Sequence, residues 1–142
     1  MNIKTIIVWV CRLVAAVIML QTLFFKFSAA DESVYIFTKV GIEPWGRIGT
    51  GVAELIASIL ILIPRTSVYG AIMGLGIMGG ALLTHIFILG IEVKGTINGR
   101  IIEPDGGQLF IYALLVFLAS LYIVWVNKNF LLEQVKAFSG KK

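Results

Sequence analysis

Charged residues, cysteine and histidine are all scarce in this chain. Only 14% of the 142 residues are charged, whereas a soluble domain carries about a quarter. There is one cysteine, Cys11, and one histidine, His85. The single cysteine excludes an internal disulfide, a CxxC redox pair and a cysteine-based zinc site within one chain. A lone histidine likewise cannot bind haem or zinc without further ligands.

Basic runs and nucleotide-binding motifs are also missing. The net charge is +4, but the lysines and arginines are scattered along the chain, so nucleic-acid binding is not expected. The glycines of GAIMGLGIMGGA follow no predicted strand, which argues against a nucleotide-binding loop. We expect them to pack helices against one another. The sequence therefore has no haem, zinc or nucleotide motif.

Hydrophobic residues are abundant: they make up 58% of the chain, and the mean hydropathy is +0.95. Four apolar segments each have roughly the ~20 residues needed to cross a bilayer. They are Thr5–Phe25, Trp45–Ile63, Val68–Ile91 and Gln108–Val126. We interpret the first as a retained span and not a signal peptide, because Arg12 interrupts its apolar core. The sequence predicts an all-α protein, a four-transmembrane-helix bundle forming a single integral membrane domain over residues 1–142.

The connections add two smaller elements to this bundle. Segment Ala30–Val40 mixes apolar and charged residues and stops at Gly41, which predicts a short interfacial amphipathic helix between the first two spans. Asn98-Gly99 lies between apolar flanks and predicts a small β-hairpin between the third and fourth spans. Asp105 is the expected N-cap of the fourth span.

The distribution of basic residues predicts an orientation. With both termini cytoplasmic, six lysines and arginines lie inside and five lie outside, which agrees with the positive-inside rule. The inner set is Lys4, Arg65, Lys128, Lys136, Lys141 and Lys142, and the outer set is Lys26, Lys39, Arg47, Lys94 and Arg100. We therefore expect a multi-pass protein of the bacterial inner (cytoplasmic) membrane, with the N-terminus and C-terminus both cytoplasmic.

Two charged residues, Arg12 and Glu54, lie deep inside the apolar segments. At roughly 1.5 Å per residue, Arg12 lies about 10 Å and Glu54 about 14 Å from the inner ends of their helices. An arginine side chain spans this difference, so we hypothesise a buried charge pair between Arg12 and Glu54. Two interpretations stay open. The pair either fixes the register of the helices or serves a ligand or a proton.

Four further polar residues gather toward the outer side of the bundle. They are Gln21, Lys26, His85 and Gln108, and we hypothesise that they line an outward-facing ligand pocket. The alternatives are that Lys26 extends to the outer headgroups and that His85 is a hydrogen-bonded interfacial histidine. No catalytic residue can be named from the sequence.

Together these segments resemble the DoxX family of small four-helix bacterial membrane proteins. The resemblance rests on Arg12 and Lys26 in the first span, on GVAELIASILIL followed by PRT, on ALLTHIF, and on DGGQLFIYALL. It extends from Arg12 to Trp125. The resemblance implies a link to membrane-associated oxidoreductase systems, including thiosulfate:quinone oxidoreductase subunits. It also marks Arg12, Lys26, Glu54 and His85 as the residues to follow.

Three functions remain open at this stage. The first is an accessory subunit of a membrane redox system that binds a quinone-like or small anionic ligand in the outer pocket. Because the chain has no electron carrier motif, redox chemistry would need a partner subunit or a bound quinone. The second is a non-enzymatic assembly or scaffold protein. The third, a small-solute or proton transporter, is disfavoured because no helix is visibly broken at mid-membrane. The expected partners are the lipid bilayer, other protein subunits and further copies of the chain.

Overall fold

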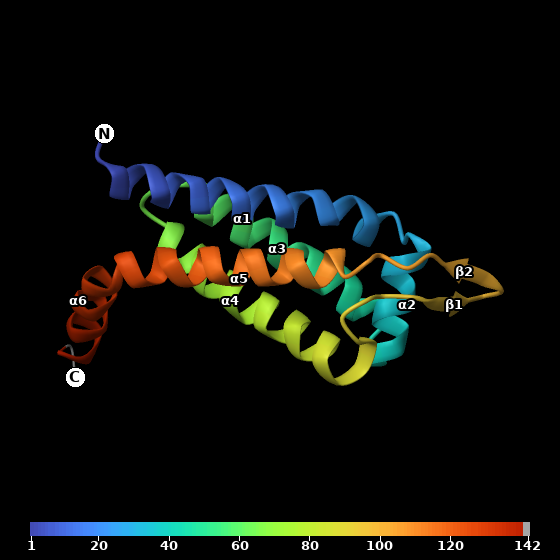
Figure 1. The fold of residues 1–142 in the computed structure, drawn as a ribbon. Coiled ribbons are helices and arrows are strands. Elements are labelled where there is room, and N and C mark those ends of the chain that lie inside the picture. Colours follow the sequence, from blue (N-terminus) through green and yellow to red (C-terminus); the bar gives the residue numbers. More distant parts are fainter. Residues whose placement is uncertain (141–142) are drawn as a thin grey trace.

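Four long helices form the body of the protein in a computed structural model, which describes residues 1–140 (Figure 1). They are α1 (Ile3–Phe27), α3 (Trp45–Leu62), α4 (Ser67–Thr84) and α5 (Gln108–Val126). A π-helical turn, η1 (His85–Leu89), continues α4. All four are long and apolar enough to cross a membrane. This confirms the predicted four-helix architecture, with boundaries that agree within a few residues, as is usual for helix ends.

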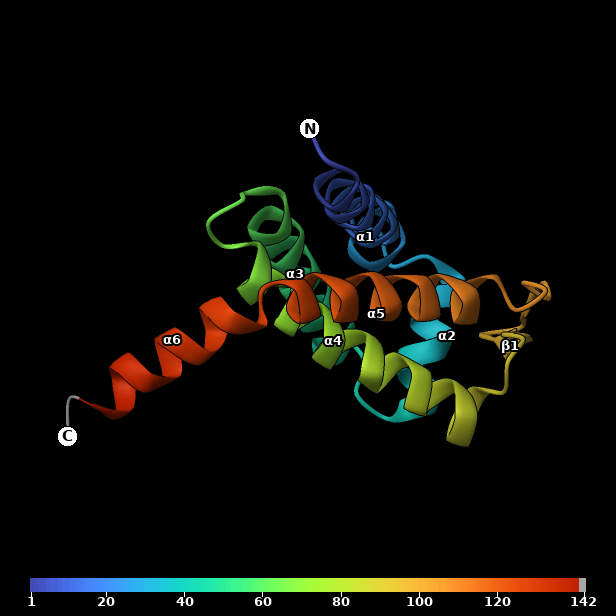
Figure 2. The ribbon, with the colours of Figure 1, turned by 60° about the vertical axis from the view of Figure 1, so that its left-hand side comes forward.

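The helices are arranged in a ring in which α1 contacts α3, α3 contacts α4, α4 contacts α5, and α5 returns to α1. The short turn after Leu62 makes α3 and α4 antiparallel neighbours. The N-terminus and α6 lie at one end of this ring, and α2 and the hairpin lie at the other (Figures 1 and 2). We call the first the terminal end and the second the capped end.

The capped end holds both small elements that the sequence predicted. Helix α2 (Asp31–Val40) ends at Gly41, whose φ of 87° lies in the left-handed region that favours glycine. Strands β1 (Gly95–Ile97) and β2 (Arg100–Ile102) pair antiparallel around Asn98-Gly99. Tyr35 of α2 donates a hydrogen bond to the Lys94 carbonyl oxygen at 3.0 Å, which ties α2 to the start of the hairpin.

The start of α5 differs in detail from the prediction that Asp105 is its N-cap. The N-cap position belongs to Gly107, and both Gly106 and Gly107 have positive φ. These two glycines turn the chain between the carboxylate and the helix. The Asp105 side chain still accepts a hydrogen bond from the Leu109 amide at 3.1 Å. It therefore satisfies a first-turn amide from two residues before the N-cap.

A sixth helix, α6 (Lys128–Ser139), was not predicted. It leaves the bundle axis after Asn127 and buries none of its residues against the rest of the chain (Figure 2). Its polar residues kept its hydropathy below that of a spanning segment. It nevertheless exposes Leu132, Val135 and Phe138. This mixture of exposed apolar and basic residues is typical of a helix that lies at a membrane surface.

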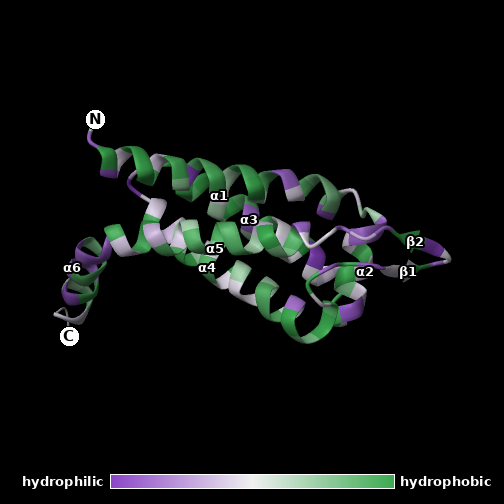
Figure 3. Cartoon of the chain, viewed as in Figure 1, coloured by the Kyte–Doolittle hydropathy of each residue, from purple (hydrophilic) through white to green (hydrophobic). Residues whose placement is uncertain are grey.

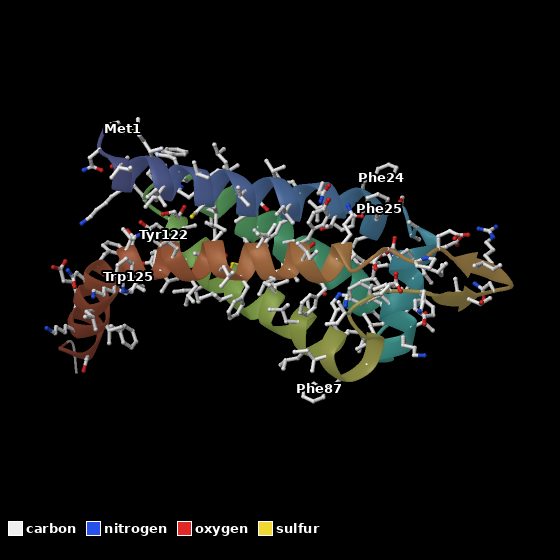
Figure 4. The ribbon with its side chains drawn as sticks, viewed as in Figure 1. Met1, Phe24, Phe25, Phe87, Tyr122 and Trp125 are labelled. Carbon is white, nitrogen blue, oxygen red and sulfur yellow. The ribbon has the colours of Figure 1, made fainter. Side chains whose placement is uncertain are left out.

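The outer surface of the bundle is apolar, as a lipid-facing surface must be. Hydrophobic residues cover the helices along their length (Figure 3), and aromatic side chains lie near both ends (Figure 4). Phe24, Phe25 and Phe87 point outward near the capped end, and Trp125 lies near the terminal end. Aromatic residues at both interfaces are typical of membrane-spanning helices.

Small residues set the spacing between α3 and α4. A Cβ atom at Gly70 would lie 2.6 Å from the Ile61 nitrogen and 2.7 Å from the Ala57 oxygen, so the two backbones touch there. At Gly76, six residues further along α4, a Cβ atom would meet nothing within 4 Å. The glycines of α4 therefore have two roles: Gly70 permits close packing, and Gly76 leaves open space.

This difference predicts opposite effects for two alanine substitutions in one helix. Gly70→Ala should destabilise the protein by about 1–3 kcal/mol, because the methyl group meets backbone that cannot move aside. Gly76→Ala should be neutral or stabilising, because alanine lowers the entropy of the unfolded chain. Thermal unfolding in detergent measures both variants. Equal effects at the two positions would contradict the close contact at Gly70.

Candidate functional site

A cavity of about 890 Å³ opens inside the half of the bundle nearest the capped end. All four spanning helices contribute to its wall, helix α2 and the segment before α5 close it, and the apolar lining includes Ile18, Phe37 and Ile77. The cavity also holds most of the polar residues that lie among the apolar segments. It is therefore the candidate functional site.

The central polar feature of the wall is a buried ion pair between α1 and α3. The Lys26 Nζ atom lies 2.9 Å from Glu54 Oε2 and 3.1 Å from Oε1. Thr22 Oγ1 lies 3.0 Å from Glu54 Oε2, and Lys26 Nζ lies 3.1 Å from Thr22 Oγ1. Glu54 is only 3% exposed. The carboxylate thus has an ammonium group and a hydroxyl group as partners, as a buried charge requires.

A second ion pair supports the first from the capped end. Arg47 binds both carboxylate oxygens of Glu43, at 2.9 and 3.0 Å from Nε. Its Nη1 also donates to the backbone carbonyl of Lys26. Because Arg47 and Glu54 both belong to α3, this contact fastens the end of α1 that carries Lys26 to the helix that carries its partner.

The predicted Arg12–Glu54 pair is wrong, because Arg12 binds backbone carbonyl groups at the end of α3. Its Nε and Nη2 donate to the carbonyl oxygens of Ile61 and Leu62, each at 2.6 Å, and its guanidinium lies 3.9 Å from the centre of the Trp9 ring. The last carbonyls of a helix lack partners within it, and Arg12 satisfies two of them. Glu54 is seven residues before Ile61, about 10 Å along α3.

The direction of the lysine side chain explains the exchange of partners. Helical side chains lean toward the N-terminus of their own helix, so Lys26 extends back into the bundle from its position near the end of α1. It therefore reaches Glu54 and does not extend to the headgroups. The number of residues from a helix end gives the depth of a Cα atom only and does not include this lean of the side chain.

The four residues of the predicted pocket all line this one cavity: Gln21, Lys26, His85 and Gln108. Gln108 Nε2 donates to the Tyr112 hydroxyl at 2.6 Å. His85 is 4% exposed, and its ring meets Phe110 edge to face with 5.7 Å between ring centres. The structure thus brings the four side chains to one space, while their role in binding a ligand stays a prediction.

The cavity wall also includes carboxylates that the sequence analysis did not assign to a pocket: Glu32, Glu103 and Asp105. Asp105 Oδ1 accepts hydrogen bonds from the amides of Val93 and Gly107 at 2.8 and 3.0 Å, which holds the segment before α5 in place. Burial raises the pKa of Glu32 above its ordinary value, and the nearby Asp105 carboxylate raises it further. Among the described lining residues, Lys26 is the single lysine or arginine.

Other contacts of the site follow from spacing along a helix. Thr22 precedes Lys26 by four residues, and Glu43 precedes Arg47 by four, so each pair shares a helix face. That spacing could have identified both pairs from the sequence. The role of Glu32 could not be found this way, because it depends on how α2 folds over the cavity. Residues 1–140 hold no group of three or more histidine, cysteine or acidic residues placed to bind a metal ion.

Four membrane-spanning helices around a cavity with a mostly apolar wall define a multi-pass α-helical membrane protein. The family model of the DoxX-like family matches residues 10–97, and the chain belongs to this family. The match includes Arg12, Lys26, Glu54 and His85 and ends before α5. No curated protein and no solved structure matches the chain.

The Lys26–Glu54 pair predicts a specific pattern in a double-mutant cycle. Lys26→Met or Glu54→Gln alone removes one partner of a buried pair, which typically costs about 3–5 kcal/mol. The double variant should cost less than the sum of the single variants, with a coupling of about 1–3 kcal/mol. Thermal unfolding in detergent gives the four stabilities.

The matched control is the same cycle with Arg12→Met in place of Lys26→Met. Arg12 and Glu54 have separate partners, so their effects should add within about 0.5 kcal/mol. Additivity in the Lys26 cycle, or strong coupling in the Arg12 cycle, would contradict the assignment.

Proposed function

We propose that this DoxX-like protein binds a quinone-like ligand in the cavity and acts as an accessory subunit of a membrane redox system. The single observation that carries the proposal is the cavity itself. Its volume of about 890 Å³ lies within the range of about 300–1,000 Å³ that is typical of small-molecule sites. Such a volume accommodates a substituted ring together with part of an apolar tail.

The lining supports a neutral, largely apolar ligand. Most of the wall is apolar or aromatic, and a few polar side chains converge on it, as in most small-molecule sites. Gln21 and Gln108 approach from α1 and α5, and His85 approaches from η1. The amide groups of Gln21 and Gln108 can donate hydrogen bonds to the oxygen atoms of a quinone ring.

The charges of the wall argue against the other ligand class, a small anion. Four carboxylates line the cavity (Glu32, Glu54, Glu103 and Asp105), whereas the single lysine there is already paired with Glu54. An anion would meet like charges with no free cation to compensate them, and electrostatic complementarity would be poor. A quinone carries no charge and avoids this cost.

The redox role rests on the family. The DoxX resemblance links such proteins to membrane oxidoreductase systems, and the sequence has no electron carrier motif. In this proposal the bound quinone exchanges electrons with a partner subunit, and the chain supplies the binding site. A scaffold protein that binds no ligand would not require a cavity with polar side chains in its wall.

Filling the cavity tests the proposal. A Cβ atom at Gly80 would meet nothing within 4 Å, and Gly80 lines the cavity, so Gly80→Phe should fold and place its ring in the ligand space. The matched control is Leu83→Phe, at an exposed position of α4 that does not line the cavity. Mass spectrometry of protein purified with native lipids should find quinone in the wild type and Leu83→Phe, and little in Gly80→Phe. A wild type without quinone would contradict the proposal.

We further propose that both termini are cytoplasmic and that the capped end faces outward from the bacterial inner membrane. The support comes from the sequence count, which gives six lysines and arginines to the terminal end and five to the capped end. Lys4, Arg65, Lys128 and Lys136 belong to or adjoin the elements at the terminal end. Lys141 and Lys142, which belong to the same predicted inner set, lie outside the described residues.

Cysteine labelling in intact cells tests the orientation in a Cys11→Ser background. An impermeant maleimide should label a cysteine that replaces Lys39 or Asn98. It should not label a cysteine that replaces Arg65 or Ser139. All four positions are exposed, so each should react once the membrane is permeabilised. Labelling of Arg65 or Ser139 variants in intact cells would reverse the orientation.

A further inference from the structure

The polypeptide around His85 forms an unusual turn that holds its ring in one orientation. The Gly90 amide donates a hydrogen bond to the His85 carbonyl oxygen at 2.7 Å, which closes the π-helical turn η1. Gly90 has a φ of 84°, a conformation that favours glycine.

The same glycine fixes which ring nitrogen carries the proton. His85 Nδ1 lies 2.9 Å from the carbonyl oxygen of Gly90. A carbonyl oxygen can only accept a hydrogen bond, so Nδ1 must be the donor. In the neutral imidazole, the other nitrogen, Nε2, then has a free lone pair and acts as an acceptor.

The Nε2 atom has open space before it. Within residues 1–140, Ser120 Oγ is the one fully enclosed side-chain polar atom without a hydrogen-bond partner. Within the same residues, Nε2 of His85 also has no hydrogen-bond partner, and it is therefore not fully enclosed. Because the residue is 4% exposed and lines the cavity, the space that Nε2 meets is the cavity. A buried acceptor is thus presented to the ligand with its tautomer already set.

We propose that His85 Nε2 accepts a hydrogen bond from a hydroxyl group of the ligand, so that the cavity prefers a quinol to the corresponding quinone. This inference rests on the proposed function and names the redox form that the site selects. Quinone oxygens are acceptors only and would face the Nε2 lone pair without a proton between them. A quinol hydroxyl supplies that proton, and the edge-to-face contact with Phe110 keeps the imidazole in position.

The first measurement concerns the tautomer and needs no ligand. The chain has a single histidine, so protein labelled with 15N-histidine and carrying a histidine-free purification tag gives the nitrogen signals of His85 alone. In mildly alkaline buffer, the 15N chemical shifts should show a protonated Nδ1 and an unprotonated Nε2. A protonated Nε2 would overturn the inference, whatever the protein binds.

The second measurement compares three ligands under anaerobic conditions: a decyl-substituted benzoquinone, its quinol, and the dimethyl ether of that quinol. The quinol should bind about 2- to 10-fold more tightly than the quinone and the ether, which is the range for one neutral hydrogen bond. His85→Phe keeps an aromatic ring against Phe110 but removes the acceptor, so the preference should disappear while quinone binding persists. The matched control, Leu83→Phe, changes an exposed residue of α4 that does not line the cavity, and it should keep the preference.

The outcomes separate this inference from the proposed function. If quinone and quinol both bind the wild type with equal affinity, or if His85→Phe keeps the preference, the inference is wrong and the quinone site stands. If neither redox form binds, the proposed function fails, and the assignment of a quinol fails with it.

Discussion

The buried carboxylate of Glu54 is the constraint on which the rest of the structure depends. A charged side chain at the centre of a bilayer costs about 2.5–3.5 kcal/mol on insertion scales, and Glu54 lies near the middle of α3. The chain meets this cost by placing Lys26 Nζ and Thr22 Oγ1 against the carboxylate, at 2.9 and 3.0 Å. The two atoms also lie 3.1 Å from each other. The carboxylate, the ammonium group and the hydroxyl group are then all hydrogen-bonded inside the bundle.

This requirement fixes α1 against α3. Lys26 and Arg47 join the two helices near the capped end, and Arg12 joins them near the terminal end through the last carbonyls of α3. Charged groups thus join α1 and α3 at two depths in the bundle. Their hydrogen bonds are stronger in a low-dielectric environment than in water. Within residues 1–140, helices α4 and α5 have no comparable polar contacts with α1 and α3. Helix α4 packs closely against α3 at Gly70, and against α5 at Gly74, where a Cβ atom would lie 2.8 Å from Ser120 Oγ. The cavity lies where that close packing ends.

Most of the architecture could be predicted because it depends on local sequence. The length of the apolar segments fixes the spans, and Asn98-Gly99 fixes the hairpin, whatever the rest of the chain does. The partner of Glu54 could not be found by counting residues, because the choice between Arg12 and Lys26 depends on side-chain direction and on competing carbonyls of Ile61 and Leu62. Helix α6 was missed because its polar residues lower its hydropathy. The π-helical turn at His85 leaves no periodic signal at all.

The polar residues of the cavity divide according to where their hydrogen bonds go. Lys26, Glu54 and Asp105 form their hydrogen bonds within the protein, and these bonds hold the wall of the cavity in place. Gln21 has no side-chain hydrogen bond within residues 1–140, and His85 leaves one nitrogen free. A ligand can supply the hydrogen bonds that these two side chains lack within the protein. Gln21 and His85, which lack these internal partners, are therefore the residues that we propose face a ligand, whereas the Lys26–Glu54 pair holds the helices that position them.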